Sequence, residues 1–167
     1  KPNMSVGLGG SESVKEIGLL DFLLENKEIT LHNQYEAGIS MEENIKRRKQ
    51  GLISDIFVTS TNAITKDGKL VNADGSGNRV AALSYGPTNV LLIVGINKIV
   101  DSLEDGFKRV MDVAATKNID RMNKKAISFG KEPKYNLDNI ARKFSWIKAD
   151  DEKGRIIIIL VDEELGY

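Results

Sequence analysis

Two polar segments of the 167-residue chain carry residue types that could bind or transform a ligand. The first, residues 7–13, reads GLGGSES and follows a strand-like run. Glycines between a strand and a helix let the backbone approach a ligand closely, and the start of a helix offers unpaired N–H groups. Such a turn suits a phosphate or carboxylate group. A plain tight turn with a helix cap would explain the same residues, because the segment matches neither the P-loop nor the GxGxxG motif.

The second segment, residues 59–79, holds more side-chain donors and acceptors than two turns require. It directly follows the strand-like run at 56–58, and ligands of open α/β sheets sit beyond the carboxyl ends of strands. Asp67 and Asp74 each precede a glycine, so ordinary turn chemistry is the alternative explanation. Arg79 could bind an anionic ligand through two hydrogen bonds, or pair with Asp74 to hold the loop closed.

Other chemistry has little support in the composition. The chain has one histidine, His32, and no cysteine, which argues against Ser-His-Asp or Cys-His catalysis and excludes cysteine-held zinc or iron–sulfur clusters. General acid–base chemistry would fall to Glu12, Glu16, Asp67 or Asp74. Asp and Asn oxygens could hold magnesium, but their spacing matches no metal cage. We therefore predict neither a metal nor a cofactor.

Overall composition predicts a globular cytoplasmic protein. Hydrophobic residues make up 41% of the chain and charged residues 29%, and 24 basic residues balance 24 acidic ones. This balance gives no field that would attract nucleic acid or an anionic membrane, and no apolar stretch is long enough to span a bilayer. We interpret the basic run at 46–49 as a solvated helix face. Residues 1–167 are predicted to form a single domain that lacks an N-terminal segment, because a strand-like run begins almost at once.

Alternating strand and helix patterns predict the scaffold that positions the two polar segments. Ser13 and Ser40 are each followed three residues later by glutamate, which indicates a capping box and the start of a helix. Further helices are expected over 102–125 and around 137–144, within an otherwise irregular stretch at 126–154. Strands are expected over 4–8, 29–35, 56–58, 80–85, 90–94 and 156–161.

The last two strands before the long helix, joined by Gly86-Pro87, should be antiparallel neighbours. The predicted fold class is α/β, with a mixed, mainly parallel sheet flanked by helices.

The stretch TSTNAITKDGKLVNADGSGNRVAALSYGP, continuing into NVLLIVGINKIV, resembles the core signature of the LUD (lactate-utilisation) domain family, of the lactate-utilisation protein C type. SVGLGGSESVKEIGLLDFL resembles the first glycine-rich turn and helix of that family, and ILVDEELGY its final strand. The resemblance implies a fold similar to the ribose-5-phosphate isomerase and CoA-transferase-like group, whose members bind anionic small molecules at glycine-rich turns.

The resemblance also implies a set of functional positions. Asp67 and Asp74 are the catalytic candidates, and the ligand-binding candidates are Gly9, Gly10, Ser11, Glu12, Asn62, Thr65, Asn72, Gly75, Gly77, Asn78 and Arg79. The implied function is binding of, or action on, an anionic small metabolite such as lactate, in support of L-lactate oxidation with iron–sulfur partner subunits. Family members of this type commonly carry a cysteine-rich stretch after the long helix, whereas residues 126–150 contain no cysteine. Any electrons would therefore pass to a partner.

Three functional interpretations remain open at this point. The chain could act on or sense an anionic metabolite, serve as a noncatalytic interaction subunit of an electron-transfer complex, or act as a phosphosugar isomerase-like enzyme. The last interpretation rests on fold analogy alone. The sequence does not decide between catalysis and binding, and it leaves a homo-oligomer open.

Overall fold

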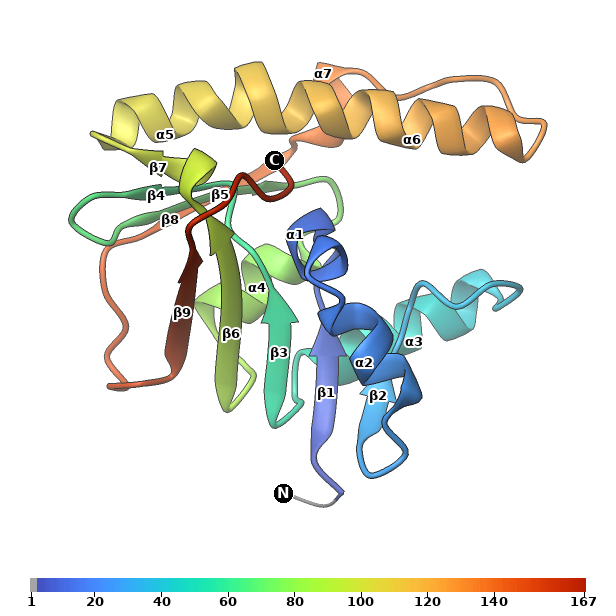
Figure 1. The fold of residues 1–167 in the computed structure, drawn as a ribbon. Coiled ribbons are helices and arrows are strands. Elements are labelled where there is room, and N and C mark those ends of the chain that lie inside the picture. Colours follow the sequence, from blue (N-terminus) through green and yellow to red (C-terminus); the bar gives the residue numbers. More distant parts are fainter. Residues whose placement is uncertain (1–2) are drawn as a thin grey trace.

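A parallel five-stranded sheet forms the centre of the molecule (Figure 1). The structure is a computed structural model that describes residues 3–167. From one edge to the other, the strands are β2 (Thr30–His32), β1 (Ser5–Leu8), β3 (Ile56–Thr59), β6 (Asn89–Gly95) and β9 (Ile156–Val161). Each pairs in parallel with its neighbours. The carboxyl ends of all five strands therefore lie at the same edge, which is the upper edge in Figure 1.

Helices lie on both faces of this sheet. The short helices α1 (Glu12–Glu16) and α2 (Leu19–Glu25) lie in front of it in Figure 1, and α3 (Met41–Gly51) and α4 (Asn78–Ser84) lie behind it. Successive residues of a strand point to opposite faces. Ile93 of β6 therefore packs with the cluster around Val14 of α1, whereas Leu92 packs with the cluster around Leu83 of α4. The predicted α/β class with helices flanking a mainly parallel sheet is confirmed.

A second, four-stranded sheet lies beyond the carboxyl edge of the first (Figure 1). Its order is β7 (Ile99–Val100), β4 (Ala63–Thr65), β5 (Leu70–Asp74) and β8 (Lys143–Ile147). The β4–β5 and β5–β8 pairs are antiparallel, and β4–β7 is parallel. A long helical stretch covers this sheet, and α7 (Leu137–Ile140) follows it. The stretch consists of α5 (Leu103–Arg109), the π-helical turn η2 (Val110–Ala115) and α6 (Thr116–Ser128).

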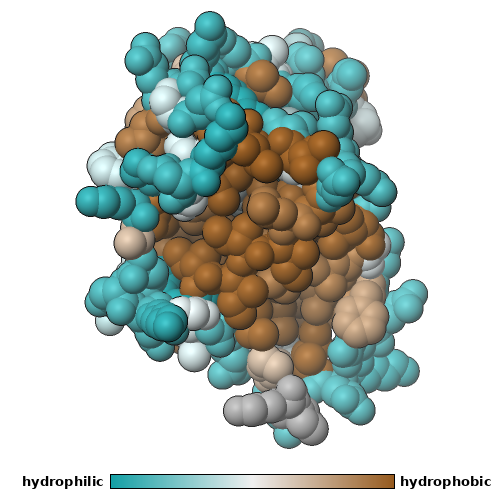
Figure 2. Space-filling view, turned by 60° about the vertical axis from the view of Figure 1, so that its left-hand side comes forward, coloured by the Kyte–Doolittle hydropathy of each residue, from teal (hydrophilic) through white to brown (hydrophobic). Residues whose placement is uncertain are grey.

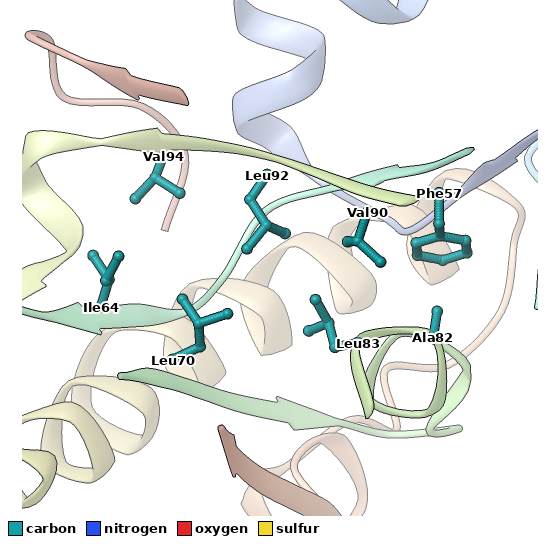
Figure 3. Packing of buried hydrophobic residues seen from close by; sticks show 8 residues of the cluster. All are labelled: Phe57, Ile64, Leu70, Ala82, Leu83, Val90, Leu92 and Val94. Atoms are coloured by element: carbon teal, nitrogen blue, oxygen red, sulfur yellow. The ribbon is translucent and has the colours of Figure 1, made fainter. Parts of the chain in front are cut away.

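One apolar cluster joins the two sheets (Figure 3). Val90, Leu92 and Val94 extend from one face of β6, because alternate residues of a strand share a face. Ile64 and Leu70 reach toward them from the β4–β5 hairpin, and the helix α4 adds Ala82 and Leu83. The polar connections from β3 to β4 and from β5 to α4 are therefore anchored by elements that share this core.

The prediction of a strand at 80–85 is wrong, because these residues belong to the helix α4. Short apolar runs fit a buried helix as well as a strand. Here the carboxylate of Asp74 accepts a hydrogen bond from the backbone N–H of Val80 at 2.9 Å, which supports the first turn of the helix. The expected antiparallel pairing with 90–94 is consequently absent. The antiparallel pairs instead involve β5, which has β4 and β8 as its neighbours.

The predicted start of the first helix is displaced by two residues. Ser11 is the N-cap of α1, and its hydroxyl accepts a hydrogen bond from the N–H of Val14 at 3.2 Å. Ser13 is fully buried, and its hydroxyl donates to the carbonyl oxygen of Leu165 at 3.1 Å. The other predicted cap is confirmed, since Ser40 accepts from the N–H of Glu43 at the start of α3.

The long helix predicted over 102–125 is confirmed, with Ser102 as its N-cap and a π-helical turn in its middle. The stretch at 126–154 is less irregular than predicted. Its short helix ends at Ile140, and β8 then pairs along the whole of β5. The strand was missed because most of its side chains remain partly exposed, which removes a clear apolar alternation.

The strand β9 is an edge of the parallel sheet, and it leaves apolar side chains uncovered. Ile157 and Ile159 lie on the same face as Leu91 and Ile93 and are 46% and 45% exposed, whereas Leu160 on the opposite face is 56% exposed. Figure 2 shows the broad apolar area on this side of the molecule. Across residues 3–167, the helices are too short or too polar to span a membrane.

Candidate functional site

A pocket of about 360 Å³ opens where the carboxyl edge of the parallel sheet meets the second sheet. The glycine-rich turn after β1 contributes Gly10 and Glu12 to its lining. The polar segment after β3 contributes Asn62, Asp74 and Arg79. Two segments that lie about fifty residues apart in the sequence thus share one concave surface, because the strands that precede them are neighbours in the sheet.

Arg79 is the centre of a hydrogen-bond network at the floor of the pocket. Its Nε donates to the carboxylate of Asp74 at 2.9 Å, and its two Nη groups donate to the side-chain oxygens of Asn72 and Asn62 at 2.8 and 2.6 Å. It also donates to the carbonyl oxygens of Ser60 and Ala73 at 3.1 and 2.8 Å. The side chains of Arg79 and Asp74 are only 11% and 9% exposed. Of the two roles considered for Arg79, the structure shows the pairing with Asp74 that holds the loop together.

The glycine-rich turn is shaped by close packing. A Cβ at Gly9 would lie 2.3 Å from the hydroxyl oxygen of Thr59, and one at Gly10 would lie 2.6 Å from the hydroxyl of Tyr35. Side chains are therefore excluded at both positions, and the Tyr35 hydroxyl reaches the backbone at the pocket wall. Burial of this hydroxyl raises the pKa of Tyr35, whereas the hydrogen bond with Gln34 and the charges of Arg48 and Arg121 oppose this shift.

The structure does not bring all of the predicted site residues to the pocket. Thr65 and Asp67 lie at the far turn of the β4–β5 hairpin, where the Thr65 hydroxyl donates to Asp67 at 2.5 Å and Lys69 forms an ion pair with it. Hydrogen bonds from Lys69 and Thr65 lower the pKa of Asp67. Asn72 is fully buried beneath Arg79. The predicted residues that line the pocket are Gly10, Glu12, Asn62, Asp74, Gly75, Asn78 and Arg79, whereas Gly9, Ser11 and Gly77 lie next to it in the chain.

Several lining residues were missed by sequence reasoning. They come from α3 and the loop before it, from α6, from α7 and the residues beside it, and from the C-terminal residue: Tyr35, Arg48, Asn118, Arg121, Tyr135, Asn139, Arg142 and Tyr167. Arg48 belongs to the basic run that was interpreted as a solvated face. The helical period offered a signal, because Asn44, Arg48 and the buried Gly51 lie on one side of α3. The remaining residues are brought in by tertiary folding, and no local pattern marks them.

The lining has an excess of positive charge. It includes four arginines, Arg48, Arg79, Arg121 and Arg142, and two carboxylates, Glu12 and Asp74. Asp74 pairs with Arg79, and Glu12 pairs with Arg121 at 2.9 Å. Within residues 3–167, neither Arg48 nor Arg142 has a carboxylate partner, and the buried Nε of Arg48 has no hydrogen-bond acceptor. Two guanidinium groups are thus left uncompensated at the pocket.

Two further basic groups, Lys98 and Arg109, lie close to residues of the pocket. The Lys98 ammonium is buried and donates to the hydroxyls of Ser13 and Ser60 at 2.8 and 2.9 Å. Burial, reinforced by the nearby charges of Arg109 and Arg79, lowers the pKa of Lys98 to about 7. Arg109 donates to the carbonyl oxygens of Asn62 and Asn97. The carboxyl edge of the sheet therefore favours negative charge. In the part of the chain that the structure describes, no cluster of His, Cys, Asp and Glu could hold a metal ion.

The fold and the pocket define the class of protein: an α/β domain with a polar, positively charged pocket at the carboxyl edge of its parallel sheet. The model of the LUD domain family matches residues 1–161, and the chain belongs to this family. At the family level, this membership suggests a role in lactate utilisation. The chain is also similar to the crystal structure of a DUF162 family protein from Deinococcus radiodurans, with a TM-score of 0.38, 13% identity, and coverage of 95% of this chain and 87% of that one. Among curated proteins, none matches the sequence.

Proposed function

We propose that the pocket binds an anionic small metabolite and that this binding is how the protein serves lactate utilisation, as a relative of the lactate-utilisation protein C type. The observation that carries the proposal is the pair of uncompensated guanidinium groups, Arg48 and Arg142, at a pocket whose other two arginines are already paired. A guanidinium group offers planar, fork-shaped donor geometry to carboxylates and phosphates. The ligand would supply the missing negative charge.

In this proposal the predicted residues divide into two groups. Gly10, Asn62, Gly75 and Asn78 face the ligand from the pocket wall, together with Arg79. The others keep the wall in place: Gly9 and Ser11 shape the first turn, Gly77 precedes α4, and Asn72 supports Arg79 from below.

Proton transfer by the predicted carboxylates has weaker support. Both oxygens of Asp74 are occupied, one by Arg79 and one by the N–H of Val80. Asp67 lies at the far turn of the hairpin, paired with Lys69. We therefore propose binding as the primary activity of the site. If L-lactate oxidation is the final outcome, the electrons pass to an iron–sulfur partner subunit, because the chain contains no cysteine to hold a cluster.

Thermal unfolding of the purified protein with added anions tests the proposal. L-lactate, succinate, inorganic phosphate and sn-glycerol 3-phosphate would each be added at constant ionic strength. A ligand at a hundred times its Kd stabilises the native state by about 2.7 kcal/mol, which raises Tm by several degrees. At least one anion should do so, and Arg48→Ala should reduce the shift.

Lys49→Ala is the matched control, because it removes a neighbouring, exposed positive charge from the same helix. It should respond to the anion as the wild type does. The proposal is overturned if none of the four anions raises Tm, or if Arg48→Ala and Lys49→Ala respond equally.

A second candidate function is that of an interaction subunit in an electron-transfer complex. The observation that favours it is the uncovered apolar surface along β9, where Ile157, Ile159 and Leu160 are about half exposed. Edge strands of this kind are sites of association with other chains. An Ile157→Lys variant should then lose binding to a purified iron–sulfur subunit in size-exclusion chromatography while keeping its response to anions. Unchanged binding would exclude β9 as the docking surface.

A further inference from the structure

Three basic residues converge on one short loop of the pocket, residues 74–77. An Nη group of Arg48 donates to the hydroxyl of Ser76 at 3.0 Å, and the Lys143 ammonium donates to the carbonyl oxygen of Ser76 at 2.7 Å. The backbone N–H of Arg142 donates to the carbonyl oxygen of Asp74 at 3.0 Å. Arg48 therefore contacts this loop through its guanidinium group, Arg142 is tied to it through its backbone, and both residues line the pocket.

The loop also has spare backbone donors. The N–H groups of Gly75, Ser76 and Gly77 donate to no acceptor in residues 3–167. Gly75 and Ser76 line the pocket. Successive unpaired N–H groups in a tight loop form concavities that bind anionic oxygens. This loop thus combines backbone donors with the guanidinium group of Arg48, and Arg142 lines the same pocket.

The charge of the lining specifies how much negative charge is missing. Four arginines against two carboxylates leave the lining with an excess of two positive charges, on Arg48 and Arg142, and Lys143 adds a further cation beside the loop. A phosphate monoester carries close to two negative charges at pH 7, on three terminal oxygens that are all strong acceptors. A dicarboxylate separates its two charges along a carbon chain, and a monocarboxylate supplies one charge. One compact dianion matches the loop best.

The size of the pocket agrees with a ligand larger than lactate. At about 360 Å³, it falls in the range of roughly 300–1,000 Å³ that is typical of small-molecule sites, and a three-carbon acid would leave most of it to solvent. The wall away from the loop offers polar groups from Tyr135, Asn139 and Tyr167 beside apolar side chains such as Val110 and Ala114. These residues suit the uncharged part of a larger molecule.

We infer that the group this pocket recognises is a phosphate monoester, held by Arg48, Arg142 and the backbone of residues 75–77. The inference rests on the proposed function, since it names the chemical class of the anion bound at the same site. The protein would then serve lactate utilisation by acting on a phosphorylated metabolite or by responding to one.

Calorimetric titration of the protein with four probes tests the inference: sn-glycerol 3-phosphate, inorganic phosphate, succinate and L-lactate. The affinity for sn-glycerol 3-phosphate should exceed the affinities for succinate and L-lactate at least tenfold. Arg48→Ala and Arg142→Ala should each weaken its binding about tenfold or more, and Lys49→Ala should leave it unchanged. Because the second ionisation of a phosphate monoester has a pKa near 6, the affinity should also fall between pH 7 and pH 5.

The outcomes separate the two proposals. If succinate or L-lactate binds as tightly as sn-glycerol 3-phosphate, the phosphate inference is overturned and anion binding stands. If none of the probes binds, both proposals fail. If sn-glycerol 3-phosphate binds equally well to Arg48→Ala, Arg142→Ala and the wild type, the phosphoryl group is held elsewhere and the inference is overturned. Circular dichroism of each variant shows whether a loss of binding reflects the site or the fold.

Discussion

Two Asp-Gly pairs stand seven residues apart in the chain, and their structural roles differ completely. Asp67-Gly68 forms the turn of the β4–β5 hairpin, with Gly68 at φ 89° and Asp67 in an exposed ion pair with Lys69. Asp74-Gly75 lies at the other end of β5, where Asp74 is almost buried and pairs with Arg79. Gly75 does not have a positive φ angle, and the left-handed position is taken by Gly77 at φ 92°.

The comparison shows that the identity of a dipeptide does not determine its role. Both pairs carry the same turn signal, but Asp74 ends a strand, supports the first turn of α4 and anchors an arginine with five acceptors. Asp67 has two hydrogen-bonding partners and is open to solvent. Burial and the number of partners distinguish the two ends of β5, and both properties arise from tertiary packing.

The largest expected effect comes from breaking the buried pair. In Arg79→Met, the Asp74 carboxylate is left nearly buried without its cation, and four further acceptors lose a donor. Removing one partner of a buried ion pair costs about 3–5 kcal/mol, and urea denaturation measures this loss. The control is Lys69→Met, which removes the cation from the exposed pair at the other end of β5. Equal losses in the two variants would contradict the distinction drawn here.

The buried Lys98, close to Arg79, should make the stability of the protein depend on pH. The pKa of the buried Lys98 is lowered from 10.5 to about 7, so the folded protein loses this proton above pH 7 while the unfolded chain keeps it up to about 10.5. The unfolded state then binds more protons, and stability rises with pH in this window. One proton contributes at most about 1.4 kcal/mol per pH unit, so the gain between pH 7 and 9 is roughly 2–3 kcal/mol.

Denaturation of the wild type and of Lys98→Met at pH 7, 8 and 9 measures this effect. The wild type should gain stability relative to the variant as the pH rises, because methionine does not titrate. Parallel curves for the wild type and Lys98→Met would show that Lys98 keeps an ordinary pKa in the folded protein.

Much of the scaffold could be predicted from the sequence, because its signals are local. The strand β6 is a continuous apolar run, and Ser40 and Ser102 stand at the starts of helices with strong caps. Helix α4 could not be separated from a strand, since seven residues with a short apolar run are compatible with both periods. Its helical form depends on Asp74 and Arg79, which act through contacts with β3 and β5.

The candidate site was predictable only in part. Gly10 and Asn62 were found because they follow β1 and β3, which end at one edge of the sheet, and Arg79 was found as the one arginine of the polar loop. Arg142 and Tyr167 come from distant parts of the chain, and the second sheet and the C-terminal residues carry them to the pocket. Turn chemistry did not predict that Asp67 forms an exposed ion pair with Lys69 outside the pocket. The spacing of the two residues in the sequence does not tell how exposed their side chains are.

Alanine at the two left-handed glycines gives a smaller contrast. Both Gly68 and Gly77 have positive φ angles, which cost an L-residue roughly 1–2 kcal/mol. A Cβ at Gly68 would meet open space, whereas at Gly77 it would lie 2.5 Å from the side chain of Lys143. Gly77→Ala should therefore be the more destabilising variant in urea, and it should also weaken anion binding by displacing Lys143 from Ser76. A larger loss in Gly68→Ala would contradict this order.

The smallest effect is expected at Asp67, and it should disappear in acid. Hydrogen bonds from Lys69 and Thr65 lower the pKa of Asp67 below its ordinary value of 3.8. The folded state thus favours the ionised form, so the contribution to stability is present above pH 3.8 and is lost as the pH falls through the lowered value. Because the pair is solvent-exposed, salt screens it, and Asp67→Asn should lower Tm only slightly at pH 7. Asp74→Asn at the other end of β5 should lower Tm clearly at the same pH, since Arg79 loses its counter-charge in a nearly buried site. Similar Tm values for the two asparagine variants would mean that burial does not separate the two carboxylates.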